Sequence, residues 1–141
     1  MSVPISNADK LSPPRGLSPA WRRWYLRCLP AYWVFLFLTT HFPKLQLQGA
    51  PPQSDKVIHF VAFGLLAFLF WRFFEALGSR INRVFFVVAA ATLAMYSGMD
   101  EYLQQFVGRG SDWGDWYADV TGIAIVLGIM ILLEMRRRRR G

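Results

Sequence analysis

Four long apolar segments occupy most of this 141-residue chain, and they constrain its fold more than any other feature. They run roughly from Cys28 to Phe42, from Val57 to Phe74, from Val84 to Met99 and from Trp116 to Met135. A bilayer crossing needs about 20 mainly apolar residues, so the first and third segments must include flanking residues. Because backbone groups in lipid must form hydrogen bonds within their own segment, each segment is expected to be a helix.

The composition favours the same class of protein. The chain is 54% apolar, and its 12 Phe and 6 Trp residues are more than a small soluble domain can bury. The predicted fold class is therefore all-α, a four-helix transmembrane bundle. Residues 23–135 are expected to form the membrane domain, between a disordered Pro-rich basic tail at residues 1–22 and a polybasic tail at residues 136–141.

The charge pattern predicts an orientation. With four crossings, both termini lie on one side of the membrane, and so do all 16 Lys and Arg residues except Lys44, Lys56 and Arg109. The positive-inside rule then places both termini in the cytoplasm. The arginine run at residues 136–140 directly follows an apolar segment, as a membrane anchor does, so the expected partner is the lipid bilayer and not nucleic acid. The oligomeric state is left open.

Polar residues gather at the opposite, outer ends of the segments. The stretch from residue 100 to residue 119 holds five of the chain's nine acids. Topology brings this stretch near the start of the second segment, which predicts one outer polar pocket. Its expected residues are Asp55, His59, Glu101, Gln104, Arg109, Asp112, Asp115 and Asp119.

Helical spacing supports this grouping, although ordinary structural roles compete with it. Asp55 and His59 are four residues apart and share a helical face, yet a histidine there can serve only as a structural hydrogen-bond partner. Glu101 can be a solvated helix end. Helix capping and the helix dipole account for Asp112 and Asp115. They do not account for Asp119, one turn deeper. We expect Arg109 to pair with the aspartates.

Three sequence blocks resemble the VanZ-like family of small bacterial membrane proteins. They are DKVIHFVAFGLLAFL, DEYLQQF and GRGSDWGDWYADVTG, in this order on consecutive segments. The resemblance implies a multi-pass protein of the bacterial cytoplasmic (inner) membrane and cell envelope, and some members of the family are linked to resistance to glycopeptide antibiotics such as teicoplanin. Where the family often has Pro-Gly-Arg and a later Asn, this chain has Val107-Gly108-Arg109 and Asp119.

Three kinds of function remain open for the polar pocket. The first is an accessory protein that binds the polar headgroup of a cell-wall lipid precursor or a related molecule. The second is an enzyme that acts on a lipid-linked substrate, with His59 and the carboxylates providing acid-base chemistry or holding a divalent metal. The third is an oligomeric proton-coupled transporter. No cofactor is required by the sequence, and no catalytic residue is assigned.

Overall fold

The computed structural model describes residues 18–41, 52–108 and 112–140, and this part of the chain is helical throughout except at the connections. Its elements, in chain order, are α1 (Pro19–His41), α2 (Pro52–Ala76), α3 (Arg83–Gln104), the short 3-10 helix η3 (Gln105–Val107) and α4 (Trp113–Arg139). The all-α prediction is confirmed.

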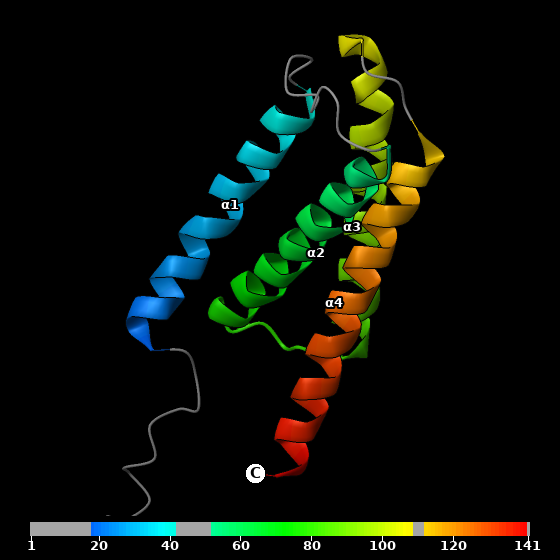
Figure 1. The fold of residues 1–141 in the computed structure, drawn as a ribbon. Coiled ribbons are helices and arrows are strands. Elements are labelled where there is room, and N and C mark those ends of the chain that lie inside the picture. The colour runs from blue at the N-terminus through cyan, green and yellow to red at the C-terminus, as the bar shows by residue number, and fades with distance from the viewer. Residues whose placement is uncertain (1–17, 42–51, 109–111, 141) are drawn as a thin grey trace, which may run out of the picture.

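Consecutive helices run in alternating directions, so their ends meet at two opposite ends of the bundle (Figure 1). The end of α1, the start of α2, the end of α3 and the start of α4 lie together; we call this the polar end. The start of α1, the connection between α2 and α3, and the end of α4 lie at the other end, called the basic end. Because α2 and α4 run in the same direction, equivalent turns of these two helices face each other.

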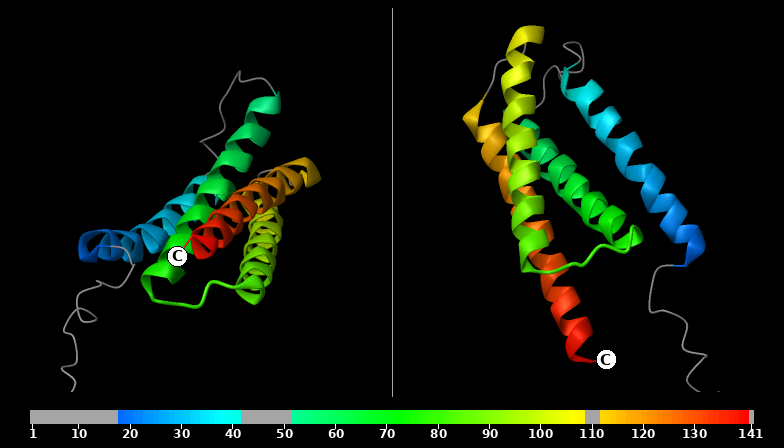
Figure 2. Two further views of the ribbon diagram at one scale, coloured as in Figure 1. Left: turned by 90° about the horizontal axis from the view of Figure 1, so that it is seen from below. Right: turned by 180° about the vertical axis from the view of Figure 1, so that it is seen from behind.

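Helix α2 occupies the centre of the bundle. It packs most closely on α4, where the Gly122 backbone lies directly against the carbonyl group of Phe60. Phe63 and Leu66 of α2 and Leu127 of α4 are fully buried in the resulting core. On its other side α2 contacts α1, where the Tyr32 hydroxyl donates to the Ala62 carbonyl at 2.9 Å. Helix α3 packs against α4, and in the view from behind the two helices cross (Figure 2).

A tight connection reverses the chain between α2 and α3. Gly78 has a φ of 78°, a left-handed conformation that glycine adopts without strain. The amide of Gly78 donates to the Glu75 carbonyl and that of Ser79 to the Phe74 carbonyl, each at 3.0 Å, which is the Schellman pattern of helix ends. Asn82 then caps α3 by accepting a hydrogen bond from the Phe85 amide.

Arginines bind helix ends and acids at the basic end. Arg22 donates to the Ala76 carbonyl at 2.7 Å, and Arg138 donates to the Ile81 carbonyl at 2.6 Å. Both carbonyls lie near the end of α2 or in the connection that follows it. These contacts tie the first and last helices to the same end of the molecule, in agreement with the basic asymmetry of the sequence.

Three of the described helices are long and apolar enough to cross a membrane, namely α2, α3 and α4. Helix α1 has 23 residues, but it is not among these three. Its exposed side nevertheless carries large apolar residues, including Val34, Phe35 and Leu38. The chain is therefore a membrane protein with three helices suited to crossing by length and composition, and a fourth that packs against them.

The helices are longer than the apolar segments from which they were predicted. Helix α1 begins at Pro19, so the last four residues of the tail expected at 1–22 are helical. A proline is well suited to a first helical turn, because its amide nitrogen carries no hydrogen and its φ is already helical. Helix α4 continues through the arginines to Arg139, which extends past the predicted end at Met135.

Candidate functional site

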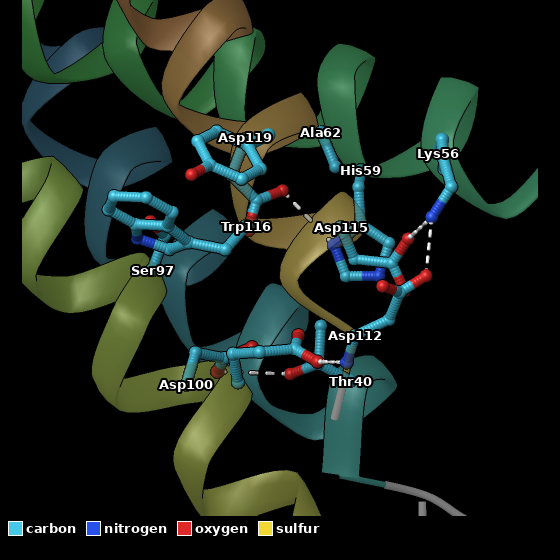
Figure 3. A network of polar contacts seen from close by, with 12 residues as sticks. Thr40, Lys56, His59, Ala62, Ser97, Asp100, Asp112, Asp115, Trp116 and Asp119 are labelled. Carbon is cyan, nitrogen blue, oxygen red and sulfur yellow. Dashed lines mark hydrogen bonds and ion pairs between the residues drawn. The ribbon is translucent and has the colours of Figure 1, made fainter. Parts of the chain in front are cut away.

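The described chain buries eight polar or charged residues, and all of them lie toward the polar end of the bundle. They are Thr40, His59, Ser97, Asp100, Glu101, Gln104, Asp115 and Asp119. Buried charges are costly unless they are paired, so their concentration at one end needs specific contacts. These contacts form two clusters, one between α2 and α4 and one between α1 and α3 (Figure 3).

In the first cluster His59 of α2 contacts Asp119 of α4. The His59 Nδ1 lies 3.0 Å from the Asp119 Oδ1. The two residues are 5% and 1% exposed, so this contact is shielded from solvent. It explains Asp119, the acid for which helix capping gave no reason. Asp119 engages Nδ1, so the Nε2 of the ring takes no part in this contact.

Lys56 extends the first cluster to the first turn of α4. Its Nζ lies 2.5 Å from the Asp112 Oδ2 and 3.0 Å from the Asp115 Oδ1. We expected Arg109 to pair with the aspartates; among the described residues it is Lys56 that does so, and Arg109 itself lies outside them. The ammonium group of Lys56 lowers the pKa of the exposed Asp112 carboxyl below its usual value.

Asp112 also caps α4, in agreement with the capping role expected from the sequence. Its Oδ1 accepts a hydrogen bond from the Gly114 amide at 2.8 Å. Asp112 thus caps the helix and contacts the lysine at once. Asp115 contacts the same lysine and Asp119 contacts His59, so both acids lie on the side of α4 that faces α2.

In the second cluster Asp100 of α3 is the central acid. Its Oδ1 accepts a hydrogen bond from the Thr40 hydroxyl of α1 at 3.1 Å, and its Oδ2 accepts one from the Gln104 side-chain amide at 3.1 Å. The His41 Nδ1 lies 3.7 Å from the same Oδ1. Asp100 is 1% exposed, because α1 closes over this end of α3.

Glu101 connects the two clusters. Its Oε1 accepts a hydrogen bond from the Asp112 backbone amide at 2.6 Å, and its Oε2 lies 3.4 Å from the Gln104 side-chain nitrogen. Glu101 is buried, so the interpretation of this residue as a solvated helix end is wrong. Glu101 thus joins the two clusters into one polar network. The network consists of Thr40, Asp100, Gln104, Glu101, Asp112, Lys56 and Asp115, with His59 and Asp119 beside them.

Of the predicted pocket residues, seven are described and lie in or beside this network. Asp55 is exposed at the edge, where one ligand atom each of Asp55, His59 and Asp115 lie within 4.8 Å of one another. Such a group of one imidazole and two carboxylates can hold a divalent metal. The eighth residue, Arg109, lies outside the described part of the chain.

Sequence reasoning did not assign Thr40, Lys56 and Asp100 to the site. Lys56 and His59 are three residues apart on α2, and Asp112, Asp115 and Asp119 form a stripe on α4. The sequence signal for Lys56 was therefore that it and His59 share one face of α2, which is complementary in charge to the aspartates on one face of α4. Thr40 gave no signal, because threonine is common in helices that cross membranes, and only packing places it against Asp100.

Comparison with known proteins places this chain in a family. No curated protein and no solved structure matches this chain. The family model described as VanZ/LLP1 matches residues 15–134. The matched region includes all four helices up to the last turns of α4, and every residue of the polar network. The chain therefore belongs to the VanZ/LLP1 family.

Proposed function

We propose that this protein is an envelope membrane protein whose polar end binds the polar headgroup of a lipid-linked or cell-wall-related molecule. The observation that carries the proposal is the set of buried acids and one histidine gathered at a single end of an otherwise apolar bundle. Ionisable groups inside membrane helices are costly and usually serve a ligand, an ion or a partner. Packing alone would be served better by apolar side chains.

The charges of the site favour a headgroup rich in hydrogen-bond donors. Six acids lie at the polar end: Asp55, Asp100, Glu101, Asp112, Asp115 and Asp119. Lys56 is the one lysine or arginine there among the described residues, and two carboxylates already hold it. Hydroxyl, amide or ammonium groups therefore complement the site. An anionic group would depend on Arg109, through bidentate hydrogen bonds.

We propose further that the polar end faces away from the cytoplasm, that the membrane is the bacterial cytoplasmic membrane, and that α1 is a fourth crossing. The arginine contacts at the basic end support this orientation through the positive-inside rule. The apolar exposed side of α1 supports its place in the bilayer.

A link to glycopeptide resistance follows from the family resemblance, and teicoplanin susceptibility of cells with and without the protein tests it.

The headgroup proposal is tested by the lipids that remain bound to the purified protein. Mass spectrometry of the wild type is expected to find a defined polar lipid, and Asp119→Asn is expected to lose it by removing the charge that contacts His59. Glu134→Gln is the matched control, because it makes the same acid-to-amide change near the basic end. Identical lipid content in all three proteins would overturn the proposal.

A second function is favoured by the cluster of Asp55, His59 and Asp115, namely a metal-dependent enzyme that acts on a lipid-linked substrate. Histidines that bind metals usually have their other ring nitrogen held by a carboxylate, a backbone carbonyl or water, and Asp119 contacts His59 in this way. The metal would activate water or polarise the substrate. Stoichiometric metal in the purified protein, lost in His59→Ala, would support this function. A fully folded protein without metal after exposure to Zn²⁺, Mn²⁺ and Mg²⁺ would rule it out.

A further inference from the structure

A groove of about 500 Å³ lies between α3 and α4, next to the polar end. The small residues Ala91, Ala94 and Gly98 of α3 line it. The aromatic residues Trp113 and Trp116 of α4 line it as well. Volumes of this size are typical of sites for small molecules.

Trp116 keeps the groove open. Its indole Nε1 lies 3.4 Å from the Ala94 carbonyl, which places the ring between the two helices. A Cβ atom added to Gly98 would lie 3.3 Å from the same nitrogen, so the ring and α3 are in close contact there. The indole therefore holds the two helices apart. Next to it, the small residues of α3 leave the groove open instead of a closed helix interface.

The groove changes in polarity along its length, as a membrane lipid does. Ala91 and Met95 lie in its apolar part, whereas Glu101, Tyr102 and Gln105 line the part near the polar end. From Ala91 to Tyr102 the helix rises about 16 Å. One leaflet of the hydrocarbon core is about 15 Å thick, half of a typical 30 Å core. The groove thus matches one leaflet in length and in direction of polarity.

Glu101 belongs both to the groove and to the polar network. It lines the groove, and its Oε1 accepts the Asp112 amide. A carboxylate has about four lone-pair positions, so it has capacity for a further donor. A molecule in the groove would therefore meet an acceptor at the point where its chain ends and its polar group begins.

We propose that this groove holds one hydrocarbon chain of a membrane lipid, whose hydrogen-bond-donating headgroup lies at Glu101; the position of the headgroup rests on the proposed function of the polar end. A lipid fits better than a second copy of the protein. Helices that associate through small residues need a close approach of their backbones. Here the large exposed side chains of Met95, Tyr102 and Trp113 line the same groove as the small residues, so they stand in the way of a second helix.

The test uses the full-length protein in lipid nanodiscs that contain phosphatidylethanolamine with a diazirine in its acyl chain. Irradiation and peptide mass spectrometry are expected to show labelling of the groove residues. Ala91→Trp fills the groove with an indole that takes the space of the acyl chain. Labelling of the groove residues is therefore expected to fall by about tenfold. Thr92→Trp is the matched control, because the neighbouring Thr92 is also exposed on α3 but does not line the groove.

Each outcome bears on a different part of the proposal. Unchanged groove labelling in both Ala91→Trp and Met95→Trp would overturn it, as would copy-to-copy cross-links at the groove that Ala91→Trp abolishes. A matching phosphatidylcholine probe, whose headgroup has no N–H donor, tests the polar end. If this probe labels the groove equally well in the wild type but not in Ala91→Trp, the chain site stands and the proposed headgroup function fails. Weaker labelling by phosphatidylcholine supports both.

Discussion

At the scale of single residues, the contact between His59 and Asp119 is the most enclosed polar interaction between α2 and α4. Asp119→Ala leaves the His59 Nδ1 buried without this partner, and such a loss typically costs about 1–3 kcal/mol. We expect a corresponding decrease in the free energy of unfolding, measured by denaturant titration in detergent micelles. His59→Leu combined with Asp119→Leu should cost less than the sum of the two single changes, because the pair is coupled.

The exposed Asp55 provides the control for this pair. It lies on the same helical face as His59, but solvent reaches it, so Asp55→Asn is expected to change stability by no more than about 0.5 kcal/mol. If Asp119→Ala were as mild as Asp55→Asn, or if the double variant were strictly additive, the buried contact would contribute nothing to stability. The role of Asp119 would then be limited to ligand binding.

At the scale of helices, the contact between α2 and α4 depends on Gly122. A Cβ atom at this position would overlap the backbone carbonyl of Phe60, and backbone cannot move aside as a flexible side chain can. Gly122→Ala must push the helices apart, and we expect it to destabilise the protein by about 1–3 kcal/mol. Because the lysine and histidine of α2 face the acids of α4, the same change should also weaken ligand binding at the polar end.

Gly128 offers a matched control on the same helix. Nothing lies within 4 Å of a Cβ atom built there, so Gly128→Ala meets open space. Alanine favours a helix over glycine by up to about 1 kcal/mol. Thermal unfolding in detergent is therefore expected to show a lower midpoint for Gly122→Ala and an unchanged or higher midpoint for Gly128→Ala. Equal effects would mean that helix propensity, and not close packing, determines both.

At the scale of the whole molecule, the proposed topology predicts which positions an impermeant maleimide reaches in intact cells. Cys28 is the only cysteine, so Cys28→Ser provides a background without thiols. Trp113→Cys should react from outside, whereas Arg139→Cys should react only after lysis. The reverse pattern would contradict the orientation. Trp21→Cys, at the start of α1, tests the fourth crossing, since it reacts from outside only if α1 does not cross.

The sequence by itself determined the helices and the end of the bundle at which the acids meet. Apolar segments in lipid have few alternatives to a helix, and alternating connections bring residues 55–59 and 100–119 to one end whatever the details of packing. Helix caps were also readable, because Asp112 precedes a helix whose amides need acceptors.

Only the tertiary structure decided the partners of these acids. Lys56 rather than a loop arginine contacts Asp112 and Asp115 in the described chain, and Thr40 reaches Asp100 from a helix 60 residues away. Such pairings depend on how far each helix is rotated and shifted along its neighbour. The apolar patterns that identify the helices leave both quantities free, because close packing of backbones and aromatic rings determines them. The groove beside Trp116 has the same origin, since one indole ring between two helices leaves no pattern in the sequence.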